Sequence, residues 1–171
     1  MTGPNPKAFF FTFLLITVPG TIFTAFPLVY YAKNGELLVT FSGAILQALA
    51  VLLLFATSLS DPGYIPRQHL GSKHQVNPHR KPSFDVLRQS AFVKLKYCHT
   101  CNLFRPPRAV HCALCDCCVE RMDHHCPWVG TCVGKRNYRT FFMFINTLLA
   151  YALFVLIVTC THLSHLVEDF R

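Results

Sequence analysis

Residues 98–132, CHTCNLFRPPRAVHCALCDCCVERMDHHCPWVGTC, hold eight of the nine cysteines in this chain of 171 residues. Two cysteines separated by two residues can reach one metal ion from a tight turn, and tetrahedral zinc sites use Cys and His at such spacings. A segment of this size with few large aliphatic residues cannot bury enough core to fold alone, so metal binding would supply the folding free energy. Free buried thiols or redox pairs are the alternative.

Counting ligands separates the cysteines into two groups. Two closed tetrahedral sites need eight ligands. Eight candidates stand at suitable spacings, and they are Cys98, Cys101, His111, Cys112, Cys115, Cys118, His125 and Cys132. Cys117, Cys126 and Cys160 remain outside this set, and Cys126 follows Asp123 and His124. A histidine can take the proton of a thiol and an acid can orient that histidine, so Cys126 is a candidate nucleophile. A ninth ligand or a spare cysteine is the alternative.

The rest of the chain is apolar. Hydrophobic residues make up 52% of it and charged residues 14%, whereas globular proteins carry about 25% charged residues. Three segments contain no charged residue, and they lie between Lys7 and Lys33, Glu36 and Asp61, and Arg139 and Glu168. Each is at least as long as the ~20 residues that a transmembrane helix needs. We expect such helices at residues 8–31, 37–60 and 140–167, which excludes a single soluble globule, a disordered tail and a fibrous protein.

The basic residues indicate the orientation. Of the 16 Lys and Arg residues, 13 lie between Asp61 and Thr140. Positive residues next to membrane spans mark the cytoplasmic side, which explains the net charge of +8 without any nucleic acid. Clustered cysteines in a reducing compartment are more often metal ligands than disulfides. We therefore predict an α-helical integral membrane protein whose second and third helices flank a cytosolic linker, 61–97, and a small zinc-bound cysteine-rich module, 98–139.

Residues 98–141 resemble the Asp-His-His-Cys (DHHC) palmitoyltransferases, a family of integral-membrane protein S-acyltransferases. The resemblance rests on the run Cys98-x2-Cys101-x3-Arg105-Pro106-x-Arg108-x2-His111-Cys112-x2-Cys115-x2-Cys118-x4-Asp123-His124-His125-Cys126-Pro127-Trp128-Val129-x2-Cys132-Val133-Gly134-x2-Asn137-x3-Phe141. The Asp61-Pro62-Gly63 sequence after the second apolar segment also resembles a motif of this family. Thr131 is a departure, since the family usually has Asn there.

The resemblance implies both a metal content and a reaction. Two zinc ions are bound in an interleaved manner: one by Cys98, Cys101, His111 and Cys118, the other by Cys112, Cys115, His125 and Cys132. Cys126 is implied to be the nucleophile, His124 its base and Asp123 the orienting acid. The acyl donor would be a long-chain acyl-CoA such as palmitoyl-CoA. The acceptors would be cytosolic or membrane proteins with a cysteine near the bilayer.

Further residues next to this motif are candidates for substrate contacts. Lys135, Arg136 and Arg139 carry charges suited to CoA phosphates, with a solvated, membrane-facing basic patch as the alternative. Trp128 is a candidate to border the acyl chain, with simple packing as the alternative. The chain would lie among the lipids of the endomembrane system (Golgi or endoplasmic reticulum) or of the plasma membrane.

The end of the chain suggests a second possibility for its function. Members of the family typically have four membrane spans followed by a Thr-Thr-x-Glu motif, whereas this chain stops at Arg171, just beyond its third span. We expect it to be truncated before the fourth helix. The alternative to an active S-palmitoyltransferase is therefore a non-catalytic zinc-binding membrane adaptor or an inactive truncated isoform.

Overall fold

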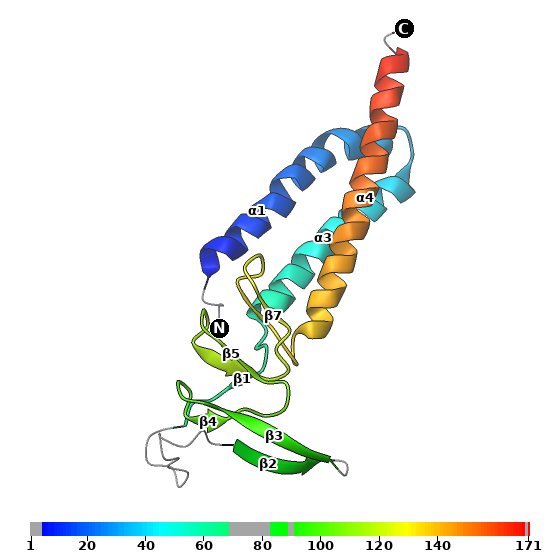
Figure 1. Ribbon diagram of the computed structural model, residues 1–171. Helices are drawn as coiled ribbons and strands as arrows, with labels where there is room; N and C mark the ends of the chain where they lie inside the picture. Colours follow the sequence, from blue (N-terminus) through cyan, green and yellow to red (C-terminus); the bar gives the residue numbers. More distant parts are fainter. Residues whose placement is uncertain (1–4, 69–82, 89–90, 170) are drawn as a thin grey trace.

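Three long helices stand at one end of the protein and a strand-rich module at the other (Figure 1). The computed structural model describes residues 5–68, 83–88, 91–169 and 171. The first helical rod consists of α1 (Pro6–Phe23), a π-helical turn η1 (Thr24–Leu28) and α2 (Val29–Lys33). The others are α3 (Leu37–Leu59) and α4 (Tyr138–Asp169). All three rods are long and apolar enough to cross a membrane, which confirms the predicted fold class.

Local sequence explains where the first two rods begin, bend and end. The Asn5 side chain accepts a hydrogen bond from the Ala8 backbone N–H at 3.2 Å and so caps α1. Pro27 lies inside η1, where the wider turn accommodates a residue that has no N–H to donate. At the end of α3, Asp61 accepts hydrogen bonds from the backbone N–H groups of Gly63 and Tyr64 at 2.8 and 2.9 Å. Gly63 adopts a φ of 108°, which favours glycine.

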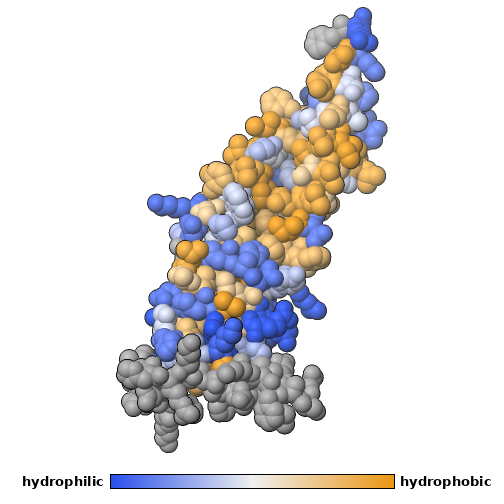
Figure 2. All heavy atoms as spheres, viewed as in Figure 1, coloured by the Kyte–Doolittle hydropathy of each residue, from blue (hydrophilic) through white to orange (hydrophobic). Residues whose placement is uncertain are grey.

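The helices present large apolar side chains outward. Phe10, Phe41, Leu52 and Ile157 are all more than half exposed, as expected where lipid replaces water. Figure 2 shows this contrast, with hydrophobic residues along the helical end and hydrophilic ones over much of the described module. The three rods therefore carry the apolar outer surface that a membrane-spanning helix needs.

Short antiparallel strands build the module. One sheet has the order β1-β6-β5, with β1 at Tyr64–Ile65, β6 at Cys117–Val119 and β5 at Val110–Cys112. A second has the order β2-β3-β4, with β2 at Ser83–Arg88, β3 at Ala91–Cys98 and β4 at Leu103–Phe104. A hairpin joins β7 (His124–Cys126) to β8 (Thr131–Val133). This hairpin lies nearest the helices (Figure 1).

The expected linker, 61–97, is not simply an irregular connection. Its described part contains β1, β2 and most of β3, and Val86 of β2 pairs with Val93 of β3. The alternation of apolar and basic residues from Val93 to Tyr97 has the period of a strand and is the sequence signal for this hairpin. Residues 69–82 of the expected linker lie outside the described part of the chain.

Candidate active site and metal centres

The module brings the eight predicted ligand residues into two clusters. The first consists of Cys98, Cys101, His111 and Cys118, and the second of Cys112, Cys115, His125 and Cys132. Within each cluster the four ligand atoms all lie within 4.8 Å of one another. The two clusters interleave along the chain, because the neighbours His111 and Cys112 on β5 belong to different clusters and Cys118 on β6 belongs to the first.

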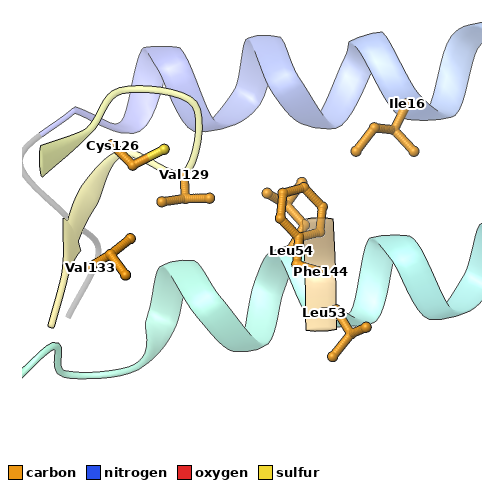
Figure 3. Close-up of a cluster of buried hydrophobic side chains, with 7 residues drawn as sticks. All are labelled: Ile16, Leu53, Leu54, Cys126, Val129, Val133 and Phe144. Atoms are coloured by element: carbon orange, nitrogen blue, oxygen red, sulfur yellow. The ribbon is translucent and has the colours of Figure 1, made fainter. Parts of the chain in front are cut away.

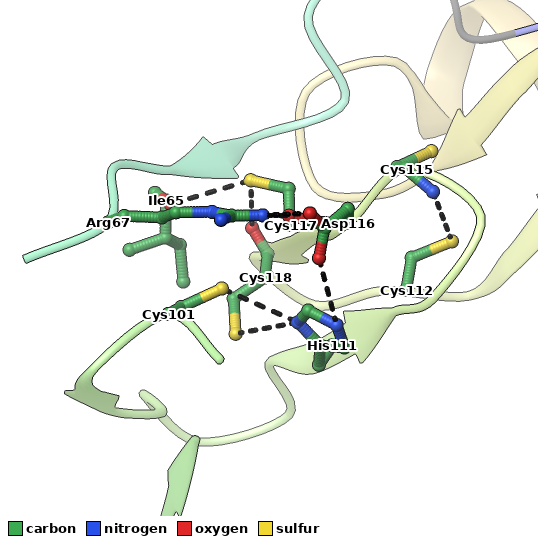
Figure 4. A network of polar contacts seen from close by, with 9 residues as sticks. All are labelled: Ile65, Arg67, Cys101, His111, Cys112, Cys115, Asp116, Cys117 and Cys118. Atoms are coloured by element: carbon green, nitrogen blue, oxygen red, sulfur yellow. Dashed lines mark hydrogen bonds and ion pairs between the residues drawn. The ribbon is translucent and has the colours of Figure 1, made fainter. Parts of the chain in front are cut away.

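His111 is central to the first cluster. Its Nδ1 atom lies 3.4 Å from Cys101 Sγ and 3.9 Å from Cys118 Sγ (Figure 4). Tetrahedral zinc with Zn–S of about 2.3 Å and Zn–N of about 2.0 Å requires S···N separations of about 3.5 Å, so these distances fit a metal ion. His111 Nε2 lies 3.8 Å from Asp116 Oδ1, and Arg67 forms an ion pair with Asp116. Histidine ligands commonly have such a carboxylate partner.

His125 has the corresponding place in the second cluster. Its Nδ1 atom lies 3.5, 3.4 and 3.6 Å from the Sγ atoms of Cys112, Cys115 and Cys132. The Cys115 backbone N–H donates to Cys112 Sγ at 3.4 Å, as the figure also shows (Figure 4). The Tyr64 hydroxyl donates to Cys115 Sγ at 3.5 Å. These hydrogen bonds favour the thiolate form that a metal requires.

The electrostatics of both clusters favour a bound cation. Burial and the neighbouring thiols raise the pKa of Cys118 and of Cys132 above the usual range. Several thiolates this close together repel one another, and a divalent cation removes that penalty. Burial and the adjacent His124 lower the pKa of His125, which favours the neutral ring that binds metal. Both donor sets therefore fit a divalent ion such as zinc.

The side chains of successive residues on β7 lie on opposite faces of the strand. Because side chains alternate along a strand, His125 faces the second cluster while His124 and Cys126 share the other face. The pairing of β7 with β8 fixes this arrangement, with His125 opposite Cys132 and Cys126 opposite Thr131. Two adjacent histidines thus have different surroundings.

His124 forms a pair with Asp123. The Asp123 Oδ2 atom lies 2.8 Å from His124 Nδ1, and the His124 ring meets the Phe141 ring edge-on at a centroid distance of 5.2 Å. Both contacts restrict the ring. The carboxylate favours the proton on Nδ1, which leaves Nε2 as the nitrogen able to accept a proton from another group.

Cys126 belongs to neither ligand cluster and is buried, with 5% of its surface exposed. It lies in a hydrophobic cluster formed by the hairpin and all three helical rods, whose other members are Ile16, Leu53, Leu54, Val129, Val133 and Phe144. Figure 3 shows Cys126 at the hairpin end of this cluster, next to Val129. The thiol therefore lies at the point where the module meets the apolar ends of the helices.

The other predicted contact residues lie at the surface of the protein. Lys135 Nζ lies 2.8 Å from Glu120 Oε2, and Arg136 forms an ion pair with Asp61. Arg139 is exposed. Trp128 is also exposed and lies outside the hydrophobic cluster, with its ring 6.3 Å from that of Phe11 on α1.

A polar cavity of about 270 Å³ adjoins Asp123. Its walls are formed by Arg108, Arg121, Asp123, Gly134, Lys135 and Tyr138. Sequence reasoning did not single out Arg121, since nothing in its spacing marks it. Arg108 and Arg121 both have a positive φ, at 65° and 44°, a backbone conformation that is uncommon for arginine. Three basic side chains thus border one concave site beside the Asp123–His124 pair.

Comparison with known proteins identifies this arrangement. The model of the DHHC palmitoyltransferase family matches residues 91–171. The chain is 43% identical to palmitoyltransferase ZDHHC14 of Mus musculus, over 96% of this chain and 37% of that protein. It is 42% identical to ZDHHC18 of Homo sapiens, over 96% of this chain and 45% of that protein. It is 42% identical to palmitoyltransferase ZDHHC9 of Bos taurus, over 91% of this chain and 47% of that protein.

The chain thus spans less than half the length of these curated relatives. The matched region contains both ligand clusters, the Asp123–His124 pair and Cys126. Residues 91–171 therefore form a domain of the DHHC palmitoyltransferase family, in a chain whose three helical rods are long and apolar enough to span a membrane.

Proposed function

We propose that this chain carries the catalytic part of a protein S-acyltransferase in which Cys126 forms a thioester with a long-chain acyl group. One observation carries the proposal. Of the three cysteines outside both ligand clusters, Cys126 shares a strand face with His124 and lies inside the apolar cluster at the helix ends. A nucleophile for an acyl chain needs this combination of a nearby base and an apolar surrounding.

The reaction exchanges one thioester for another. His124 accepts the proton of the Cys126 thiol, and the thiolate attacks the carbonyl carbon of an acyl-CoA. The bond between that carbon and the CoA sulfur breaks, and CoA leaves as the thiol with the proton from His124. An acceptor cysteine then attacks acyl-Cys126 in the same way and releases the Cys126 thiol. Asp123 stabilises the protonated His124 ring in both steps.

The apolar cluster supports a long-chain donor. A chain attached at Cys126 starts among Leu53, Leu54 and Phe144 and has the helix interfaces ahead of it. Burial of each methylene stabilises an apolar chain by about 0.8 kcal/mol relative to water. Palmitoyl-CoA is therefore a suitable donor.

The polar cavity supports binding of the CoA part. Arg108, Arg121 and Lys135 line it beside Asp123, so negatively charged phosphates would lie close to the acyl-transfer site. Lys135 also pairs with Glu120, and Arg136 with Asp61, so these two charges are partly neutralised. Arg108 and Arg121 are therefore the stronger candidates for phosphate contacts among the residues that line the cavity.

Zinc is the metal that the two clusters suit best. Each cluster offers four protein ligands, the number that fills a structural tetrahedral site. Bound zinc would hold the strands together, while the proton transfers remain with His124 and Cys126. The excess of basic residues in the module supports a cytosolic location for it, in the endomembrane system or the plasma membrane. Proteins with a cysteine near the bilayer are the acceptors.

Incubation of the full chain with labelled palmitoyl-CoA tests the proposal. We expect a hydroxylamine-sensitive adduct on Cys126 that is absent from Cys126→Ser. The matched control is Cys117→Ser, since Cys117 also lies outside both clusters, and it should keep the adduct. Both variants should retain two metal ions per chain. An adduct that persists in Cys126→Ser, or an unlabelled parent chain, would contradict the proposal, and the latter would favour a metal-binding adaptor.

A further inference from the structure

Asn137 is a fully buried polar residue at the start of α4. Its side chain makes three hydrogen bonds. Oδ1 accepts from the Gly134 backbone N–H at 2.9 Å, and Nδ2 donates to the carbonyl oxygens of Cys132 at 2.9 Å and Thr57 at 3.3 Å. A buried amide that makes three bonds holds its partners in fixed places. Asn137 therefore joins two separate pieces of backbone, the segment from Cys132 to Gly134 and the end of α3 at Thr57.

These pieces belong to different parts of the molecule. Cys132 lies on β8 and contributes to the second cluster. Thr57 is fully buried near the end of α3, and its own hydroxyl donates to the Leu53 carbonyl at 2.8 Å. Leu53 in turn packs in the cluster that contains Cys126. One side chain thus connects the metal-binding strand to the helix that lines the nucleophile.

The other backbone hydrogen bonds at this junction contact the segment that follows α3. The Glu120 N–H donates to the Gly63 carbonyl at 2.8 Å, and the Arg136 N–H donates to the Pro62 carbonyl at 3.3 Å. Among the described residues, the Asn137 amide supplies a hydrogen bond from the module side of this junction to the backbone of α3 itself.

The pairing of β7 with β8 links the Asn137 hydrogen bonds to the position of Cys126. Cys132 pairs with His125, and the next pair along the hairpin is Thr131 with Cys126. Any movement of β8 away from α3 therefore moves Cys126 out of the apolar cluster. We infer that Asn137 is a positioning residue, which holds the β7–β8 hairpin against α3 and so keeps the Cys126 thiol at the ends of the helices. The inference rests on the proposed function of Cys126.

The chemistry of the amide suggests the variants. Asn137→Asp keeps an acceptor for the Gly134 N–H but loses both N–H donors. Asn137→Leu has a side chain of similar size that can neither accept nor donate a hydrogen bond. Each variant leaves the Thr57 and Cys132 carbonyls without their buried partner, which favours local opening of the junction. Neither variant removes a ligand of a metal cluster.

Alkylation of Cys126 in the full chain, in detergent or membranes, measures this opening without any acyl transfer. Iodoacetamide labelling of Cys126, quantified by peptide mass spectrometry, should be slow in the parent chain. We expect it to be roughly tenfold to hundredfold faster in both variants, with two metal ions per chain retained. The control is Asn34→Asp, which changes an exposed asparagine between α2 and α3 and should label at the parental rate.

Two outcomes would overturn the inference. Parental labelling rates in both variants would show that Asn137 does not hold Cys126 in place. Fast labelling accompanied by loss of metal in both variants would show that Asn137 only maintains the fold of the module. A parent chain that forms no acyl adduct would contradict the proposed function and leave the alkylation comparison unaffected.

Discussion

The hydroxyl groups of Tyr64 and Thr131 lie 3.1 Å apart although 67 residues separate them in sequence. Tyr64 belongs to β1, just after the turn that ends α3, while Thr131 pairs with Cys126 in the β7–β8 hairpin. The Tyr64 hydroxyl also donates to Cys115 Sγ. The segment after α3 therefore contacts both the second cluster and the partner strand of the candidate nucleophile. Thr131, where the family usually has Asn, supplies a hydroxyl for this contact.

Tyr64→Phe should weaken metal binding at the second cluster. The change removes one hydrogen bond to a thiolate ligand, and loss of such outer partners typically costs about tenfold or more in metal affinity. Competition with a chromogenic chelator should show one metal per chain released faster than in the parent. Tyr97→Phe removes a hydroxyl that bonds to Asn102 and should leave this release unchanged. Equal release from Tyr64→Phe and the parent chain would contradict the role of the hydroxyl.

His124→Ala and His125→Ala should fail in different ways. Loss of a general base typically lowers a rate by about 10²- to 10⁴-fold, so His124→Ala should form the acyl adduct slowly while it retains both metals. His125→Ala removes a ligand and should lose about one metal per chain together with stability. Metal analysis and acyl-CoA labelling distinguish the two, and the reverse result would exchange the two roles.

Metal removal should unfold the module and spare the helices. The strands from β5 to β8 are short and depend on the two clusters, whereas the helices satisfy their own backbone hydrogen bonds in the membrane. A strong chelator should therefore expose the thiols of residues 98–132 to alkylation while the helical circular dichroism signal persists. Loss of the helical signal in step with metal release would contradict this division.

Arg121→Asn should weaken binding of acyl-CoA. Asparagine tolerates the positive φ of this position, so the variant removes the charge without backbone strain. A single charge-assisted contact to a phosphate is worth ~1.5–3 kcal/mol, so we expect KM for acyl-CoA to rise roughly tenfold or more with a smaller change in kcat. Arg171→Gln, at the far end of α4, is the control (Figure 1). An unchanged KM would remove Arg121 from the binding site.

Asp61 should make a small contribution to stability that disappears in acid. Partial burial raises the pKa of Asp61, but the N–H groups of Gly63 and Tyr64 together with Arg136 outweigh it and hold the pKa below its usual value. Because the pKa is depressed on folding, the contribution is present above about pH 4 and is lost as the pH falls through the folded-state pKa.

The matching variant is Asp61→Asn, which keeps the turn and loses the ion pair with Arg136. Asp61 is partly exposed, so the difference in unfolding free energy should be at most about 1 kcal/mol. This difference in unfolding free energy between the parent chain and Asp61→Asn should be constant from about pH 8 to pH 5 and shrink below about pH 4. Thermal unfolding followed through Trp128 fluorescence measures it, and a difference that grows in acid would contradict the assignment.

The helices and the ligand residues were predictable because both depend on spacing along the chain. The charge-free segment from Glu36 to Asp61 indicates a span whatever it packs against, since the membrane restricts composition residue by residue. The pairs Cys98–Cys101 and Cys112–Cys115 likewise show their ligand spacing locally. The assignment of the eight candidate ligands to two separate clusters was predicted from the family resemblance and not from the spacing.

Contacts between distant segments were not predictable in the same way. Lys135 and Arg136 were selected for their charge, but their pairing with Glu120 and Asp61 depends on how α3, β6 and α4 meet. Asn137 is a position of the quoted motif, but the motif does not show its bond to Thr57, which spans 80 positions. Such contacts arise from tertiary structure and leave no local pattern.

The alternation of the two ligand sets also has a consequence for biosynthesis. Cys118 completes the first set, whereas the second set waits for His125 and Cys132. At translation rates of about 5–20 residues per second, this interval is on the order of a second. During it, Cys112 and Cys115 have left the ribosome as unmatched thiols beside a complete site. Metal delivery to the nascent chain can therefore begin before α4, which ends at Asp169, is complete.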